Sequence, residues 1–335
     1  MKVKLGRREL DSFHLIALCV AVGFIVYGLI GCISERRQND NGEPLPFAGE
    51  ATTISAGGSL SSGFVGLRVD GTVLNAGDYF ATQRIADISS THERIVFDWH
   101  DIVAVSAGWY HTVGLKSDGT VVTAGWFLHP FDFSDWHDIV AVSAGSSART
   151  VGLRADGTVA ADGFNREEQL EISGWYDIVA VSAGGGHAVG LRVDGTVVAV
   201  GRDDHGQVSD VSAWRDIVAV SAGLHHTVGL KSNGTVVAVG DNFSSQLDLS
   251  DWYDIAAVSA GGVHTVGLKS NGTVVSTESW ASGEEINVSG WRNIVAVSAS
   301  RSYTLGLRSD GTVVIAGDIW SDYLDFSDWY DIKIP

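Results

Sequence analysis

The sequence predicts an all-β fold, a seven-bladed β-propeller, and three observations lead to it. One unit recurs seven times along the chain. Each unit consists of short runs of β-forming residues separated by glycine-containing turns. The last unit ends with the piece that the first unit lacks, which indicates a ring closed by pairing of its N- and C-terminal segments.

The repeat is marked by Val-Gly-Leu followed by Lys or Arg, with Leu-Gly-Leu in the last copy. Successive glycines of this motif are 48 residues apart once and 38 or 39 residues apart five times, and Asp-Gly-Thr or Asn-Gly-Thr follows each time. A constant period of this size is typical of propellers and solenoids. The seven glycines are Gly66, Gly114, Gly152, Gly190, Gly229, Gly267 and Gly306.

Each unit predicts three strands and a weaker fourth. The first is Ile-Val-Ala-Val-Ser-Ala, the second is His-Thr-Val-Gly-Leu-Lys, and the third is Thr-Val-Val-Ala-Val or a close variant. The Asp-Gly or Asn-Gly between the second and third strands supplies the positive φ angles of a tight hairpin turn. A weak fourth strand is expected in the variable stretch that follows, as at 246–249. About four strands in about 38 residues suit a propeller blade.

The two ends of the repeat region distinguish a closed ring from an open solenoid. The first unit begins at Ala51 without the Trp-x-(Asp/Asn)-Ile motif, and the last unit ends just after the motif that begins at Trp329. Closure would protect sheet edges that an open array leaves exposed. The motif's tryptophans are expected to pack between neighbouring blades; they are Trp99, Trp136, Trp175, Trp214, Trp252, Trp291 and Trp329.

Other repeated polar residues are interpreted as structural, because catalysis needs one site and not seven. Equivalent histidines are expected to bond their own loops, as buried polar groups usually find a partner. The Lys or Arg after each motif leucine is expected to form a local pair with a hairpin aspartate, which contributes little stability at a surface. The equivalent histidines are His111, His187, His226 and His264.

These units resemble the regulator-of-chromosome-condensation repeat family over about residues 51–335. The resemblance is carried by the Val-Ser-Ala-Gly-x-x-His-Thr core, the Asp-Gly turn, and traces of Asn-x-x-Gly-Gln-Leu at 203–208 and 242–247. It implies a seven-bladed propeller. The family includes a nuclear, chromatin-binding exchange factor for a small GTPase and a secreted bacterial β-lactamase inhibitor. The second is similar to this chain in expected compartment, but a shared fold does not carry a function over.

The N-terminal segment predicts a membrane tether. Residues 13–33 carry no formal charge and, as a helix, would be about 31 Å long, enough to cross a bilayer core. The flanking basic residues favour a propeller on the extracytoplasmic side of the cell membrane. The predicted organisation is a basic cytoplasmic N-terminus (1–12), a signal anchor or lipoprotein signal (13–33), a linker (34–50) and the propeller (51–335).

An uncleaved anchor and a cleaved lipoprotein signal are both open, because Leu29-Ile30-Gly31-Cys32 resembles the bacterial lipobox with Cys32 as the lipidated residue. Cys19 and Cys32 are the only cysteines, so the repeat region has no thiolate metal site and no disulfide. The formal charge is −18, from 22 basic and 40 acidic residues. This balance excludes a nucleic-acid binder, whose footprint would be basic.

Function is expected where the units differ. Strand direction places the Ala-Gly-x-x-His loops and the loops after the third strands on one face, and that face carries aromatic residues outside the repeat pattern. Aromatic residues anchor protein interfaces and also stack on sugars. The candidate binding residues are Trp109, Tyr110, Trp126, Phe127, His205, His225, Phe243, Trp280, Trp320 and Tyr323.

The leading hypothesis is a non-enzymatic, membrane-tethered module that binds a protein through this variable face. A carbohydrate or cell-wall-polymer binding module is the alternative. A hydrolase or lyase is the weakest hypothesis, because no phosphate-binding loop, metalloprotease motif or nucleophile elbow is present in the sequence. No catalytic residue, metal or cofactor is predicted.

Overall fold

The structure is a computed structural model. It describes residues 3–5, 8–10, 54–57, 64–76, 98–125, 131–146, 149–163, 171–277 and 286–317, together with Trp329 and Ile332. Two short strands near the N-terminus, β1 (Val3–Leu5) and β2 (Arg8–Leu10), form an antiparallel pair in which Val3 lies opposite Leu10. All other strands belong to the repeat region.

The repeat region forms seven antiparallel sheets of three strands, one for each predicted unit. We number these blades 1 to 7 in chain order. Blade 1 is β3 (Ile54–Ala56), β4 (Phe64–Leu67) and β5 (Val73–Ala76); blade 2 is β6 (Ile102–Ala107), β7 (His111–Lys116) and β8 (Val121–Gly125); blade 3 is β9 (Ile139–Ala144), β10 (Arg149–Arg154) and β11 (Val159–Gly163); blade 4 is β12 (Ile178–Ala183), β13 (His187–Arg192) and β14 (Val197–Gly201); blade 5 is β15 (Ile217–Ala222), β16 (His226–Lys231) and β17 (Val236–Gly240); blade 6 is β18 (Ile255–Ala260), β19 (Thr265–Lys269) and β20 (Val274–Ser276); blade 7 is β21 (Ile294–Ala299), β22 (Tyr303–Arg308) and β23 (Val313–Gly317).

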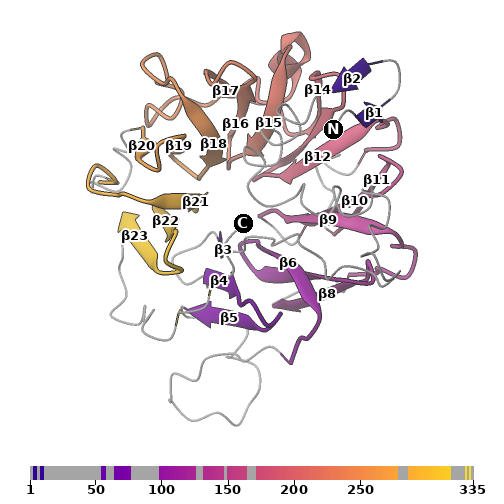
Figure 1. Ribbon diagram of the computed structural model, residues 1–335. Coiled ribbons are helices and arrows are strands. Elements are labelled where there is room, and N and C mark those ends of the chain that lie inside the picture. Colours follow the sequence, from indigo (N-terminus) through magenta and orange to yellow (C-terminus); the bar gives the residue numbers. More distant parts are fainter. Residues whose placement is uncertain are drawn as a thin grey trace.

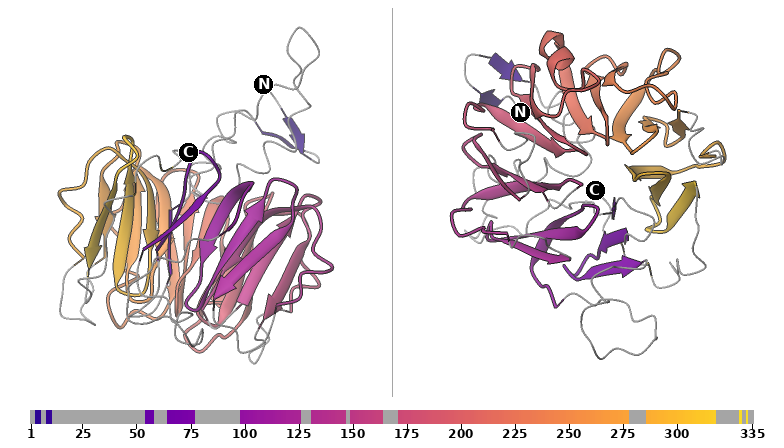
Figure 2. Two further views of the ribbon diagram at one scale, coloured as in Figure 1. Left: turned by 90° about the horizontal axis from the view of Figure 1, so that it is seen from below. Right: turned by 180° about the vertical axis from the view of Figure 1, so that it is seen from behind.

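The blades are arranged around a central axis, with the first strand of each blade nearest to it (Figure 1). Figure 2 shows the blades from the side, standing next to one another as a disc. In each blade the middle strand pairs with both others. In blade 4, His187 lies opposite Gly201 and Leu191 lies opposite Val197.

This register defines two faces. The loop face carries the connections between first and second strands and the segments that leave the third strands, so His187 and Gly201 lie near it. The turn face carries the Asp-Gly-Thr or Asn-Gly-Thr hairpins, whose glycines have positive φ, for example 79° at Gly195. The prediction that the variable loops share one face with the Ala-Gly-x-x-His loops is confirmed.

Among the residues that the structure describes, the expected weak fourth strand is not found. Each described blade has three strands. Residues 246–249 form no strand, with a turn at 246–247, and the corresponding part of blade 4 contains the short 3-10 helix η2 (Ser209–Ala213). The reason is that side chains stabilise these segments as loops. The Asp203 carboxylate accepts hydrogen bonds from the backbone N–H groups of Val208 and Ser209, and the side-chain carbonyl of Asn242 accepts one from the N–H of Leu247.

The predicted membrane segment at 13–33 and its candidate Cys32 lie outside the described residues. Among the residues that are described, no helix is long and apolar enough to cross a bilayer.

The repeated tryptophans pack against the repeated glycines. An added Cβ at Gly229 would lie 2.7 Å from the Trp214 ring, and one at Gly152 would lie 2.5 Å from the Trp136 ring. Trp214 also belongs to one buried cluster with Val189 and Leu191 of the preceding blade. Each tryptophan therefore fills the space between two blades, as predicted, and the middle-strand glycine is needed because its neighbour is an indole ring.

Blade 7 lies beside blade 1. The Ala56 N–H donates to Ser298 Oγ at 3.0 Å, and the rings of Phe64 and Tyr303 are 4.8 Å apart. Ile332 bridges Arg68 in the antiparallel sense. In blade 4 the same register position is filled by Ile178 opposite Arg192. Trp329 covers Gly66, with an added Cβ 3.0 Å from its ring.

Candidate functional site: the loop face and the central cavity

Hydrogen bonds between first strands join every blade to the next. The alanine N–H at the end of one first strand donates to the serine Oγ of the preceding blade, at 2.9–3.0 Å. The donor–acceptor pairs are Ala56–Ser298, Ala107–Ser55, Ala144–Ser106, Ala183–Ser143, Ala222–Ser182, Ala260–Ser221 and Ala299–Ser259.

The repeated histidines bond the next blade rather than their own loops, which corrects the prediction. His187 Nε2 lies 2.9 Å from Thr227 Oγ1, and His226 Nε2 lies 3.1 Å from Thr265 Oγ1. His111 and His264 make the same contact with Thr150 and Thr304. The prediction failed because these partners lie 39 or 40 residues apart and meet only when two blades pack together.

The threonines fix the histidine tautomer. The Thr227 hydroxyl donates its one proton to the Gln207 carbonyl at 2.8 Å. Its oxygen can therefore only accept from His187, so that imidazole carries its proton on Nε2. Thr265 and the Gln246 carbonyl repeat the arrangement. The glutamines thus tie the variable loops of blades 4 and 5 to the core.

Burial holds these imidazoles neutral. Desolvation lowers the pKa of His111 and His226 to about 4 and that of His187 and His264 to about 3, from a usual 6.5. The positive charge of Arg149 lowers the pKa of His111 and His187 further. A neutral, hydrogen-bonded imidazole inside the fold is a structural group, in agreement with its interpretation from the sequence.

Two junctions use other pairs. In blade 3, Arg149 replaces the histidine, its guanidinium bonds the carbonyls of Gly184 and Gly185 in blade 4, and that blade has Ala188 where others have threonine. In blade 7, the Tyr303 hydroxyl donates to the Gly57 carbonyl at 2.7 Å, and blade 1 has Phe64 at the threonine position. At these two junctions, the replacement on one blade is matched by a replacement on its neighbour.

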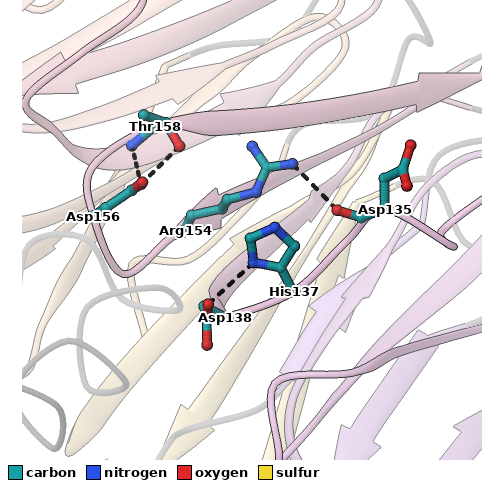
Figure 3. Close-up of polar contacts among 6 residues, drawn as sticks. All are labelled: Asp135, His137, Asp138, Arg154, Asp156 and Thr158. Carbon is teal, nitrogen blue, oxygen red and sulfur yellow. Dashed lines mark hydrogen bonds and ion pairs between the residues drawn. The ribbon is translucent and has the colours of Figure 1, made fainter.

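The turn face is occupied by local hydrogen bonds (Figure 3). The Asp156 carboxylate accepts from the backbone and hydroxyl of Thr158, and these bonds lower the pKa of Asp156. Arg154 bonds the backbone carbonyl of Asp135, not the hairpin aspartate, and His137 pairs with Asp138. The positive charge of Arg154 also lowers the pKa of Asp156, so in this unit the predicted local pair is present as an electrostatic interaction and not as a direct contact.

Three predicted binding residues gather on the loop face of blades 4 and 5. The rings of His205 and His225 are 5.8 Å apart. Asp241 connects the next loop to this pair, because its N–H donates to the His225 carbonyl while its carboxylate accepts from the backbone of Phe243. The Phe243 side chain is 90% exposed, more than any other large hydrophobic side chain among the described residues. We call His205, His225 and Phe243 the blade 4–5 patch.

Two further predicted residues lie on blade 2. The rings of Trp109 and Tyr110 are 6.5 Å apart in an edge-to-face arrangement. Arg301 of blade 7 lies over Trp109, with 5.7 Å between the guanidinium carbon and the ring centre. Sequence reasoning missed Arg301, although it occupies the loop position of blade 7 that Trp109 occupies in blade 2. The remaining candidates, Trp126, Phe127, Trp280, Trp320 and Tyr323, lie outside the described residues.

A central cavity opens among these groups. Its volume is about 160 Å³, and its lining includes all seven serines of the inter-blade hydrogen bonds together with Trp109, Leu224 and Arg301. No group of three or more metal-ligating side chains occurs among the described residues. The loop face therefore offers a small polar cavity with aromatic residues at its edge.

The fold and this face define a class: a β-propeller built from three-stranded repeats with one variable face. Residues 102–127, 178–207 and 217–246 match the model of the Regulator of chromosome condensation (RCC1) repeat. The chain is thus an RCC1-like seven-bladed propeller, as the resemblance implied.

Solved structures agree on the fold. The CRINKLY WD40 ectodomain of the receptor kinase ACR4 from Arabidopsis thaliana is similar with a TM-score of 0.64 and 20% identity, over 82% of this chain and 96% of that one. Prp20p from Saccharomyces cerevisiae is similar with a TM-score of 0.59 and 16% identity, over 90% of each chain. A search of curated proteins by sequence finds no match.

Proposed function

We propose that this chain is a membrane-tethered propeller outside the cytoplasm that binds a protein partner through its loop face, without catalysing a reaction. The observation that carries the proposal is the blade 4–5 patch. Phe243 is exposed to water although its loop is held by hydrogen bonds on both sides. A rigidly presented aromatic side chain is the kind of residue that anchors a protein interface.

RCC1-like relatives support a protein partner. Prp20p is described with binding properties to Gsp1p and histones, and also in a complex with Kap60. The similar structures from ACR4 and from CR4 of Physcomitrella patens are the ectodomains of receptor kinases. These similarities are in the fold, so they support a general role in protein binding and no particular partner.

The partner test compares two exposed aromatic residues on opposite faces. The full chain with an affinity tag is cross-linked in the envelope of its own cells and purified, as wild type, Phe243→Ala and Tyr253→Ala. Tyr253 is 61% exposed and lies on the turn face under Lys269. We expect one protein at constant stoichiometry with wild type and Tyr253→Ala, and its loss with Phe243→Ala.

Two results would contradict this proposal. Equal capture by all three proteins would remove the blade 4–5 patch from the interface. Retention of a polysaccharide and of no protein would favour the carbohydrate-binding alternative.

The membrane tether is a separate part of the proposal. It is supported by the uncharged segment 13–33 and its basic flanks. Membrane fractionation of wild type, of a chain lacking residues 1–33 and of Cys32→Ser tests it. Loss of membrane association only on deletion indicates an anchor, whereas loss in Cys32→Ser as well indicates lipidation; association retained on deletion would overturn the tether.

We also propose that the ring is closed by the C-terminal motif. The supporting contacts are Trp329 over Gly66 and the bridge from Ile332 to Arg68, each in the position that other blades fill with residues of their own unit. Without closure, units 1 and 7 would each leave a strand edge exposed, and closure would cover both edges.

A further inference from the structure

The central cavity presents hydrogen-bond donors. A serine hydroxyl has one proton to donate and two lone pairs with which to accept. The seven serines of the inter-blade hydrogen bonds each accept an alanine N–H, and none of these seven donates its own proton to another of the described residues. Ser143 and Ser298 are buried residues, only 9% and 8% exposed, and their hydroxyl protons are uncommitted.

The charge around the cavity is positive, although the chain as a whole carries −18. Arg301 is the one charged side chain among the described residues that line the cavity. The guanidinium of Arg149 lies directly behind the lining, on the carbonyls of Gly184 and Gly185. Uncommitted donors beside a cation are the arrangement that binds an anion.

The side chains at the cavity mouth and the cavity volume indicate which kind of anion would bind. The mouth adds two apolar side chains, Trp109 and Leu224, to the single cation Arg301. One positive charge at the mouth matches a monoanion, and the two apolar side chains there suit a ligand with a carbon skeleton. A volume of about 160 Å³ has room for a small organic acid.

We propose that the loop-face mouth of the central cavity binds a carboxylate, which accepts from the Arg301 guanidinium and the serine hydroxyls while its carbon skeleton lies against Trp109. The carboxylate belongs to a small free acid or to the C-terminus of a polypeptide, since both present the same group. The site is independent of the blade 4–5 patch, because none of that patch's three residues lines the cavity.

The test uses 4-fluorophenylacetate and its neutral amide as probes of the purified full chain, with binding followed by fluorine NMR. We expect the acid to bind and the amide not to bind. Arg301→Gln should lower the affinity for the acid about tenfold, because a hydrogen bond to a charged group is lost. Arg192→Gln is the matched control, because the Arg192 guanidinium lies on the turn face, 4.6 Å over the Tyr176 ring. This variant should bind the acid with the affinity of wild type.

Three further measurements complete the test. Competition by acetate, and by a tetrapeptide with a free or an amidated C-terminus, distinguishes a small acid from a polypeptide end. Ser298 is the inter-blade serine nearest in sequence to Arg301. Ser298→Ala should weaken binding of the acid, and thermal unfolding confirms that this variant is folded. Equal binding of acid and amide, or wild-type affinity in Arg301→Gln, would overturn the site; wild-type affinity in Ser298→Ala would overturn the role of its hydroxyl.

Discussion

Thr227 in blade 5 accepts the Nε2 proton of His187 and donates its own proton to the carbonyl of Gln207, so one hydroxyl holds a core strand and a variable loop of blade 4. All three residues are almost completely buried. This arrangement connects the packing between blades to the loop that carries His205.

Thr227→Val tests that connection. The change keeps the shape of the side chain and leaves two buried polar groups without a partner. We expect a loss of about 3 kcal/mol in the free energy of unfolding, measured by urea denaturation. Thr196→Val, in a hairpin turn near the surface, is the control and should cost much less. Equal losses would show that the buried hydroxyl has no special role.

The glycine under each tryptophan gives a second prediction. Gly229→Ala places a methyl group 2.7 Å from the Trp214 ring and should lower the free energy of unfolding by about 2 kcal/mol through overpacking. Gly290→Ala is matched, because nothing lies within 4 Å of a Cβ added there. Thermal unfolding compares the two variants. A destabilised Gly290→Ala and an unaffected Gly229→Ala would contradict the packing described.

Because the histidines are buried in their neutral form, the free energy of unfolding is expected to decrease as the pH is lowered. Their pKa values of about 3 to 4 in the folded chain lie below the usual 6.5, so the unfolded chain binds more protons between these values. Stability is complete above about pH 6.5 and is lost as pH falls, with each histidine contributing at most about 1.4 kcal/mol per pH unit.

Urea midpoints between pH 6.5 and 4.5 measure this effect. The hairpin carboxylates, such as Asp118, have a lowered pKa and change protonation below this window, so the histidines dominate it. His264→Gln should reduce the slope relative to wild type. A slope that is unchanged in this variant would show that His264 is not held neutral by burial.

Ring closure predicts that Trp329 stabilises the whole propeller. Trp329→Ala should lower the free energy of unfolding by about 3–5 kcal/mol, as expected for a buried tryptophan. Trp291→Ala is the matched variant, because Trp291 covers Gly306 within its own unit. Similar losses support closure; a loss confined to Trp291→Ala would mean that the C-terminal motif does not hold blade 1.

Sequence reasoning found the parts of this fold that are local. Seven units, three strands in each and the hairpin turns follow from patterns within about 25 residues, and the tryptophans follow from their repetition. The expected fourth strand failed because the side chains of buried Gln246 and exposed Asn242 accept backbone N–H groups and stabilise the segment as a loop. In the candidate site, the grouping of His205, His225 and Phe243 was predicted only as membership of one face.

The hydrogen bonds between blades could not be predicted from the sequence. The histidine–threonine and serine–alanine bonds join residues about 39 positions apart, and their geometry depends on how the blades pack. Arg301 was missed for a related reason: its position is marked only by comparison of the seven Ala-Gly loops, where it replaces a small or apolar residue.

The matched pairs at the blade junctions determine which units could be duplicated. A copy of blade 5 inserted after itself would place His226 against a second Thr227, and both new junctions would be complete. A copy of blade 4 inserted in the same way would place His187 against Ala188, and the imidazole would lose its hydroxyl. The propeller can therefore gain a blade by tandem copying at some positions of the ring and not at others, so the pairs at its interfaces limit how its blade number can change during evolution.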